Sequence, residues 1–359
     1  MLHLLVLLPS LAMAQDTIPG NLVPPHGTTP GLLIAGGQGG KTSVEFWLPN
    51  EARCTLPNLT SPMDDGPSVD VIEDRVVACE GSTCFHLAST GWQQVAETFI
   101  ERKSHTSAIT QQGLLLVGGW SSPSTTELVN INTGTSKQGF NLKHPRQNHC
   151  SIQVTRSTII LTGGGGASRQ ADGPSSSAVT EYSGLGGLNG PAVRDLPSLL
   201  TPRGSHACGL YTLTGTQVAR ANPPTPQVLI VTGGLNGEEV LDSTEVLEYG
   251  GGGWREVGRL PAPKCQQKGA TVGGVFHVAG GGDFDSETSV ILSWDPVAES
   301  WSVAGHMEIA RNYHAVTAVP LSLLSYFCPF AQLTSDSTKA ASSGLMTIPM
   351  LLTLRCFSE

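Results

Sequence analysis

Short apolar runs that end in paired glycines recur along this chain. Each run is too short for a helix and suits a strand buried on both faces. Two glycines in succession let the backbone turn through positive φ and approach a neighbouring strand closely. The pairs are Gly36–Gly37, Gly118–Gly119, Gly163–Gly164, Gly233–Gly234 and Gly280–Gly281, with a degraded copy at Val76–Gly81.

Two other features recur in phase with these runs. An Arg-x-x-His motif occurs at Arg102/His105, Arg146/His149, Arg203/His206 and Arg311/His314. A β-rich stretch that often begins with Thr-Glu follows the glycines, as at Thr126–Glu127, Thr180–Glu181 and Thr244–Glu245, and a bulky residue comes after it, as at Trp92, Phe140, Trp254 and Trp301. Repeats in such register predict one structural unit used several times.

Glycine pairs after an apolar strand, a Glu/Tyr strand and then a tryptophan resemble the kelch repeat. The resemblance covers roughly residues 31–319 and implies an all-β, six-bladed propeller with four-stranded antiparallel blades. The apolar run before Gly36 has no Arg-x-x-His strand ahead of it, and the strand after His314 has no glycine pair behind it. We therefore expect the N- and C-terminal strands to share one blade. Five or seven blades remain alternatives, because the copy near residues 62–81 is degenerate.

Four segments are predicted. Residues 1–14 read as a signal peptide, because an apolar stretch precedes Ala12-Met13-Ala14 and is too short to span a bilayer; the alternative is a buried N-terminal segment. Residues 15–30 are a linker, 31–328 the propeller and 329–359 an irregular or disordered tail. The chain is thus expected to be secreted, without a membrane span.

The eight cysteines fit an oxidising compartment. Cys79 and Cys84 have the spacing of a disulfide across a tight hairpin. Cys150 and Cys208 follow the repeat histidines, and Cys54 and Cys328 lie near the two ends of the propeller, so each pair is a candidate disulfide. Asn58 begins an Asn-Leu-Thr glycosylation sequon.

Metal and cofactor sites are not predicted. Ligands must lie about 2 Å from zinc, and the four histidines come from different blades, so we expect them and their arginines to hydrogen-bond backbone and neighbouring blades instead. The acidic loop Gly280–Glu287 lacks the full calcium-binding pattern and suggests a solvated hairpin. Glycine runs such as Gly163–Gly166 lack the Lys-Ser/Thr of a phosphate loop.

The net charge of −9 argues against nucleic acid as a partner, which needs a basic surface. No catalytic motif is found: Ser61–Gly66 only approaches a sialidase turn, and no tyrosine suggests a copper-radical oxidase site. The sequence favours a protein- or glycan-binding module that uses inter-strand loops. Two insertions, Gly184–Pro191 and Gly215–Pro226, are longer than ordinary loops and are expected to be either disordered, the favoured interpretation, or functional. The alternative is an extracellular carbohydrate-active enzyme, of isomerase or oxidase type, with its site at the channel mouth. The ligand, its binding face and the oligomeric state are not indicated.

Overall fold

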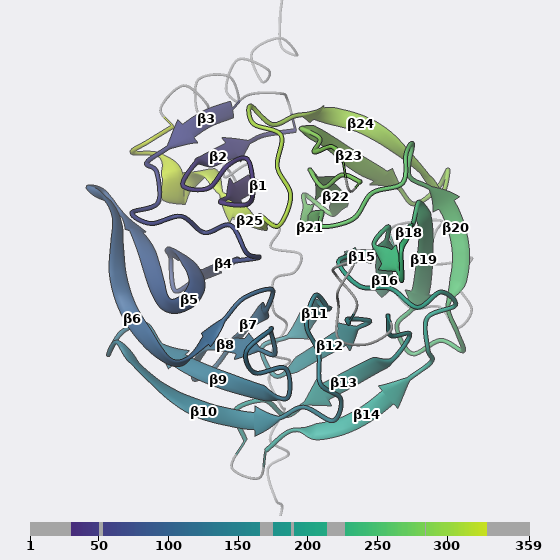
Figure 1. Cartoon of the computed structure of the whole chain (residues 1–359), viewed down its shortest axis with the longest axis horizontal. Helices are drawn as coiled ribbons and strands as arrows, with labels where there is room; N and C mark the ends of the chain where they lie inside the picture. Colours follow the sequence, from purple (N-terminus) through teal and green to yellow (C-terminus); the bar gives the residue numbers. More distant parts are fainter. Residues whose placement is uncertain are drawn as a thin grey trace, which may run out of the picture.

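Six antiparallel sheets are arranged radially around a central axis, like the blades of a propeller (Figure 1). The computed structural model describes residues 30–49, 53–165, 175–187, 190–213, 227–283 and 285–328. The predicted signal peptide and tail lie outside these ranges, and of the predicted linker only Pro30 is described, as the first residue of a strand. The predicted all-β, six-bladed propeller is confirmed.

The blades, each given from its inner to its outer strand, have the following bounds. Blade 1 contains β25 (Ala315–Pro320), β1 (Pro30–Ala35), β2 (Val44–Trp47) and β3 (Arg53–Leu56). Blade 2 contains β4 (Ser68–Ile72), β5 (Arg75–Ala88) and β6 (Gly91–Arg102); blade 3 contains β7 (Thr106–Thr110), β8 (Gly113–Val117), β9 (Thr125–Asn130) and β10 (Thr135–Asn141).

The second half of the ring follows the same plan. Blade 4 contains β11 (Cys150–Thr155), β12 (Thr158–Thr162), β13 (Val179–Ser183) and β14 (Ala192–Leu196). Blade 5 contains β15 (Ala207–Thr212), β16 (Gln227–Thr232), β19 (Ser243–Glu248) and β20 (Arg255–Arg259), with a small ribbon of β17 (Leu235–Asn236) and β18 (Glu239–Val240). Blade 6 contains β21 (Lys268–Val272), β22 (Val275–Ala279), β23 (Val290–Asp295) and β24 (Ser300–His306).

Strand β5 of blade 2 folds back on itself. The Cα atoms of Cys79 and Cys84 are 4.2 Å apart, whereas five residues of extended strand would separate them by roughly 16 Å. The part before this reversal pairs with β4, and the part after it pairs with β6. Blade 2 therefore also has four strand segments, although the degraded copy of the repeat has no glycine pair to make its turn.

The two ends of the propeller meet in blade 1. Strand β25 pairs antiparallel with β1 over the whole length of both, from Pro30 opposite Pro320 to Ala35 opposite Ala315. The predicted closure is thus confirmed, and the inner strand of the first blade comes from the end of the propeller sequence.

The core lies between adjacent blades. Alternate residues of β1 face opposite neighbours, because side chains alternate across a strand. Leu33 packs against Val69 and Val76 of blade 2, whereas Leu32 packs against Val272 and Ile291 of blade 6. The glycine-terminated strands are buried on both faces for this reason.

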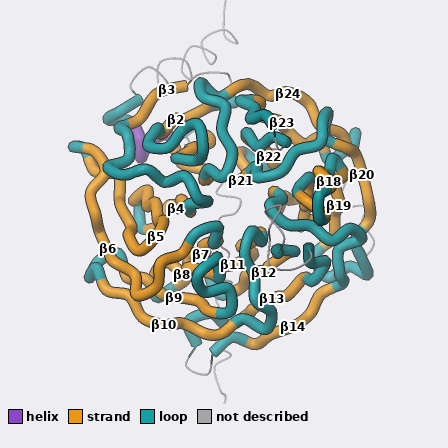
Figure 2. Tube along the Cα trace, viewed as in Figure 1, coloured by secondary structure: helices purple, strands orange, loops and turns teal. Residues whose placement is uncertain are grey.

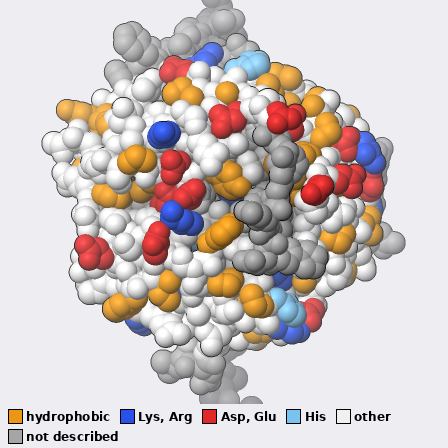
Figure 3. Space-filling model, in the orientation of Figure 1, with side chains coloured by type: hydrophobic (Ala, Val, Ile, Leu, Met, Phe, Trp, Pro, Cys, Tyr) orange, Lys and Arg blue, Asp and Glu red, His pale blue; other side chains and the backbone are white. Residues whose placement is uncertain are grey.

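Loops and turns join the strands at both ends of the ring, as the tube view in Figure 2 shows. No helical segment of the described residues could span a bilayer. A short 3-10 helix, η2 (Leu321–Leu324), follows β25. Acidic and basic side chains are interspersed on the face seen in Figure 3.

Candidate functional site

The six inner strands β4, β7, β11, β15, β21 and β25 surround a central channel. Its cavity has a volume of about 360 Å³. Apolar side chains such as Val71, Ile152 and Leu210 form part of the wall. Between them lie polar side chains from five of the strands, namely Asp70, Ser107, Ser151, Gln153, Lys268 and Thr317. A mixed wall of this kind suits a small ligand that has both polar and apolar faces.

A ring of backbone hydrogen bonds narrows one end of the channel. In every blade, the residue two positions before the inner strand has a positive φ. These residues are Gly66, Ser104, Asn148, Ser205, Gln266 and Tyr313. Five of the six bonds join these residues directly. The backbone nitrogen of each residue from Tyr313 back to Asn148 donates to the carbonyl of the preceding residue in the ring, and Gly66 N donates to Tyr313 O at 3.1 Å. The sixth runs from Ser104 N to Asp65 O at 2.7 Å. Only about 10 Å³ remains beside this ring, no more than one water molecule needs.

Asp70 supplies a carboxylate to the channel. Ser107 Oγ donates a hydrogen bond to Asp70 Oδ2 at 2.6 Å. Burial raises the pKa of Asp70 to about 6, although the hydrogen bond from Ser107 works in the opposite direction. The carboxylate is therefore ionised at neutral pH and can take up a proton in mild acid.

Lys268 lies toward the narrow end, because it borders both the wide channel and the small space beside the ring. The salt bridges of the described residues do not include Lys268. Burial lowers the pKa of its ammonium group to about 8. The channel thus contains an amine that is easily deprotonated.

The four repeat histidines are packed between blades, and His105 also borders the channel. His105, His149, His206 and His314 are each at most 1% exposed. His149 Nε2 is hydrogen-bonded to Thr106 Oγ1 of the preceding blade at 2.8 Å, and His206 Nε2 to Thr162 Oγ1 at the same distance. Burial, followed by the neighbouring arginine, lowers the pKa of every one of them. They are therefore neutral at pH 7.

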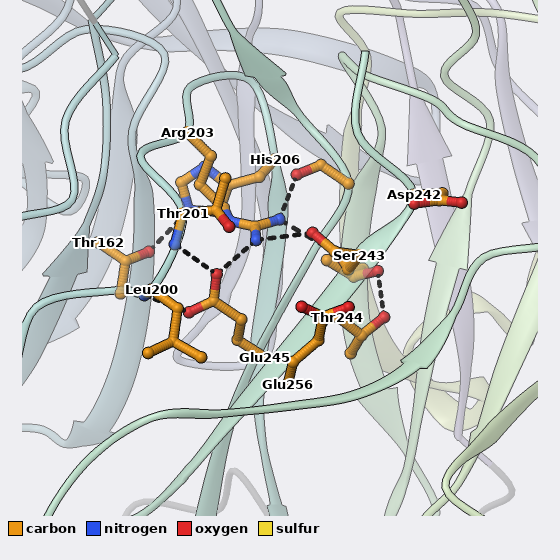
Figure 4. A network of polar contacts seen from close by, with 12 residues as sticks. Thr162, Leu200, Thr201, Arg203, His206, Asp242, Ser243, Thr244, Glu245 and Glu256 are labelled. Atoms are coloured by element: carbon orange, nitrogen blue, oxygen red, sulfur yellow. Dashed lines mark hydrogen bonds and ion pairs between the residues drawn. The ribbon is translucent and has the colours of Figure 1, made fainter. Parts of the chain in front are cut away.

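The arginine of each motif joins the inner strand to its own blade. Arg203 Nη1 donates to the carbonyl of Gly233 at 2.7 Å, and its Nη2 donates to Glu245 Oε1 at 2.6 Å (Figure 4). Arg311 makes the corresponding contacts with Gly36 O, at 2.9 Å, and with Glu45. In these two blades the contacts link the arginine, the first glycine of the pair and a glutamate of the third strand, Glu245 in β19 and Glu45 in β2.

Arg102 and Arg146 also bind the first glycine of their pair, although Arg146 Nη2 donates to Thr180 Oγ1 and not to a glutamate. Arg102 Nη1 donates to Gly118 O at 2.8 Å, and Arg146 Nη1 donates to Gly163 O. Among the described residues, no group of three or more His, Cys, Asp or Glu side chains is arranged to hold a metal ion. Each motif arginine and three of the four histidines thus have structural hydrogen-bond partners. Asp70 and Lys268 lie on the inner strands of blades 2 and 6, the two blades that lack the Arg-x-x-His motif.

Blade 6 contains a variant of this motif that the sequence reasoning missed. Lys264 and Gln267 occupy the places of arginine and histidine, and Gln267 Nε2 donates to Thr232 O at 2.9 Å. The available signal was a basic residue three positions before a polar one, ahead of the strand Val275–Ala279. The same reasoning missed Asp70 and Lys268, because it followed the Arg-x-x-His motif, which blades 2 and 6 lack.

Three disulfides are formed, and they are the pairs considered from the sequence: Cys54–Cys328, Cys79–Cys84 and Cys150–Cys208. Cys150 and Cys208 join the inner strands β11 and β15 and form part of the channel wall. Cys265 is buried and unpaired in the described structure. Three disulfides indicate an oxidising environment.

Two other predicted sites lie on the outside of the molecule. Asn58 is exposed, in the loop between β3 and β4. In the acidic loop after Gly281, Asp283 Oδ1 accepts hydrogen bonds from the backbone nitrogens of Asp285 and Ser286 at 3.0 and 2.8 Å. This carboxylate therefore holds a turn of its own loop. Of the two insertions, residues 188–189 and 214–226 lie outside the described residues.

Comparisons with known proteins bear on the fold. No family model matches the chain, and neither does any curated protein sequence. Solved structures do match, and one of them is the structure of YjhT, with 11% sequence identity and a TM-score of 0.59. The match covers 80% of this chain and 99% of that one. At this identity the likeness shows the fold alone: the chain is a six-bladed β-propeller.

Proposed function

We propose that this chain is a secreted propeller of the kelch type that binds a saccharide in the wide end of its central channel. The observation that carries the proposal is the channel itself, about 360 Å³ in volume and narrowed at one end by the backbone ring. Hydroxyl, amide and carboxylate groups alternate in its wall with aliphatic side chains. Sugars present hydroxyl groups beside apolar C–H faces, so they match such a wall.

The motif geometry supports the kelch assignment. Glycine pairs end the second strand of five blades, and each motif arginine binds the carbonyl of the first glycine in such a pair. Two of the three motif tryptophans have equivalent roles: Trp92 Nε1 donates to Pro57 O and Trp254 Nε1 to Pro197 O, each in the loop at the edge of the preceding blade. Residues that recur in sequence thus recur in structural role.

Secretion is supported by the three disulfides and by the exposed position of Asn58. A non-reducing peptide map of protein from the culture medium tests it. We expect residues 1–14 to be absent, Asn58 to carry glycan and the three disulfides to be present. Free cysteines together with retained residues 1–14 would instead favour a cytosolic adaptor of the kelch type.

Saccharide binding is tested by glycan-array screening, followed by titration calorimetry with the best ligand. Asp70→Asn removes the carboxylate from the channel, and we expect it to weaken binding at least about ten-fold, the loss of one charge-assisted hydrogen bond. The matched control is Asp242→Asn, because Asp242 pairs with Arg259 near the surface and should bind as the unmodified chain does. Equal binding by both variants, or no saccharide binding at all, contradicts the proposal.

One observation favours an isomerase as the second candidate. Asp70 and Lys268 line the same channel, and their pKa values of about 6 and about 8 lie on either side of neutrality. Such a pair can exchange protons with a bound sugar at physiological pH. NMR exchange spectroscopy of the bound sugar distinguishes the two functions: a binder leaves the rate of interconversion unchanged, whereas an isomerase raises it.

A further inference from the structure

Lys268 differs from every residue at the equivalent position of the other blades. It is the first residue of its inner strand and directly follows the position that histidine occupies in four other blades. The equivalent residues are Ser68, Thr106, Cys150, Ala207 and Ala315. Each of these is small or uncharged, so a single cationic side chain stands at this level of the ring.

The surroundings of Lys268 contain no carboxylate that pairs with it. Among the described residues, Lys268 takes part in no salt bridge, and the carboxylate of Asp70 accepts a hydrogen bond from Ser107. The positive charge of Lys268 contributes to lowering the pKa of all four motif histidines, His105, His149, His206 and His314. The four histidines near the amine are neutral at pH 7. At pH 7.4 roughly a fifth of the amine is unprotonated if its pKa is about 8.

We propose that Lys268 is a nucleophilic amine that forms a reversible imine with a small aldehyde or ketone in the channel. An unprotonated lysine in a desolvated site is the usual nucleophile for this reaction. The nitrogen lone pair adds to the carbonyl carbon, and the nitrogen then loses both of its protons. The carbonyl oxygen takes up two protons and leaves as water, so no oxidant or reductant is needed.

Imine formation requires a ligand with a free carbonyl group, which is a narrower class than saccharides in general. A reducing sugar presents its carbonyl group when its ring opens, whereas a methyl glycoside cannot open. The inference rests on the proposed function for the identity of the ligand as a sugar, but the reactivity of Lys268 toward a simple carbonyl compound does not depend on it.

Lys264 provides an internal control. Burial lowers its pKa to about 8 as well, yet it is 6% exposed and does not border the channel. If a lowered pKa were sufficient, both lysines would react. If access from the channel is required, only Lys268 reacts.

The test uses D-glyceraldehyde with cyanoborohydride at pH 7.4, followed by quantitative peptide mapping of each lysine. We expect Lys268 to be reductively alkylated at least ten-fold faster than the exposed Lys41 and Lys137, and Lys264 to remain unmodified. Lys268→Arg keeps the positive charge, and this variant should melt as the unmodified chain does while losing the fast-reacting site. Alkylation of Lys268 at the rate of the exposed lysines, or slower, overturns the proposal.

A second arm separates this inference from the proposed function. Titration with the methyl glycoside of the best array ligand reports binding without imine formation. Retained glycoside binding with no fast alkylation refutes the imine and leaves saccharide binding intact. Fast alkylation without glycoside binding supports the reactive amine and contradicts the saccharide site.

Discussion

Arg311 Nη2 lies 2.6 Å from Glu45 Oε1, although the two residues are 266 positions apart in the chain. Arg311 precedes β25 and Glu45 lies in β2, so the ion pair spans the inner and outer halves of the blade in which the chain closes. Both side chains are at most 5% exposed. The same arginine–glutamate contact that lies within blade 5, between Arg203 and Glu245, thus joins the two ends of the propeller in blade 1.

Arg311→Ala is expected to destabilise the protein by about 3–5 kcal/mol, because it leaves Glu45 charged and buried without a partner. Urea unfolding measures the change. Arg259→Ala is the control: its pairs with Asp242 and Glu256 lie at the surface, where such pairs contribute about 1 kcal/mol or less. Equal effects of the two substitutions would show that Arg311 does not hold the closure.

Removing Cys54–Cys328 should cost more stability than removing Cys79–Cys84. The first disulfide links residues 274 positions apart and the second links residues five apart. Loop-closure entropy alone gives about 5.6 kcal/mol for the first and about 2 kcal/mol for the second. Unfolding of the paired Cys→Ser variants compares them, and a larger loss for Cys79–Cys84 would contradict the entropic account.

Gly37→Ala is expected to destabilise the protein by about 2 kcal/mol or more. Gly37 has a φ of +86°, and an added Cβ would lie 2.4 Å from Asn312 O, so the substitution causes both backbone strain and overlap. Gly252→Ala is the matched control, since its Cβ would meet nothing within 4 Å. Thermal melts of the two variants should differ clearly; similar melting temperatures would argue against close packing at the glycine pair.

Stability is expected to fall as the pH drops from about 6.5 toward 3. The buried motif histidines have folded pKa values below the unfolded value of 6.5, near 3 for His105 and His314. The unfolded chain therefore binds more protons in this range, and the stability that is complete above pH 6.5 is lost on acidification. Asp70 and Glu80, with folded pKa values raised to about 6 and about 7, act in the opposite direction but are fewer.

His149→Gln tests this origin of the acid sensitivity. Gln267 occupies the equivalent position in blade 6, so glutamine fits the site without a titratable group. Melting temperatures measured at pH 7.5 and pH 5 should differ less in the variant than in the unmodified chain. An unchanged difference would assign the acid sensitivity to other groups.

Saccharide affinity should decrease below about pH 6. Ionised Asp70 accepts hydrogen bonds from sugar hydroxyl groups, and protonation of the carboxyl, whose pKa is about 6, removes part of that capacity. Calorimetric titrations between pH 5 and 7, where Lys268 stays mostly protonated, measure the trend. Asp70→Asn should bind more weakly but with a flat pH profile, and a variant profile as steep as the original would exclude Asp70 as the titrating group.

The repeats predict most of the fold because their constraints are local and periodic. A glycine pair such as Gly233–Gly234 adopts positive φ and ends the strand in the same way in each copy. A strand that is apolar on both faces needs a neighbouring blade on each side, so six copies in register predict a closed ring. The closure follows from counting strands. Blade 2 is different, because the hairpin at Cys79–Cys84 replaces the glycine turn and only the geometry shows that β5 reverses.

The site is less predictable because its residues are not part of the repeat. Asp70 and Lys268 come from different blades and differ from the residues at equivalent positions, so no periodic signal marks them. They line the same channel because the curvature of the ring brings distant inner strands to one axis. The repeat arginines and histidines stand out in the sequence, yet they pack between strands and support the wall.

The pairing of β1 with β25 also affects how the chain is made. During synthesis, β1 emerges near the beginning of the chain and its partner near the end, so an unpaired apolar strand edge must persist until almost the whole propeller has been translated. Such an edge invites pairing with other chains. The cell that makes this protein therefore has to protect blade 1 longest, and any truncation before residue 315 leaves that blade permanently open.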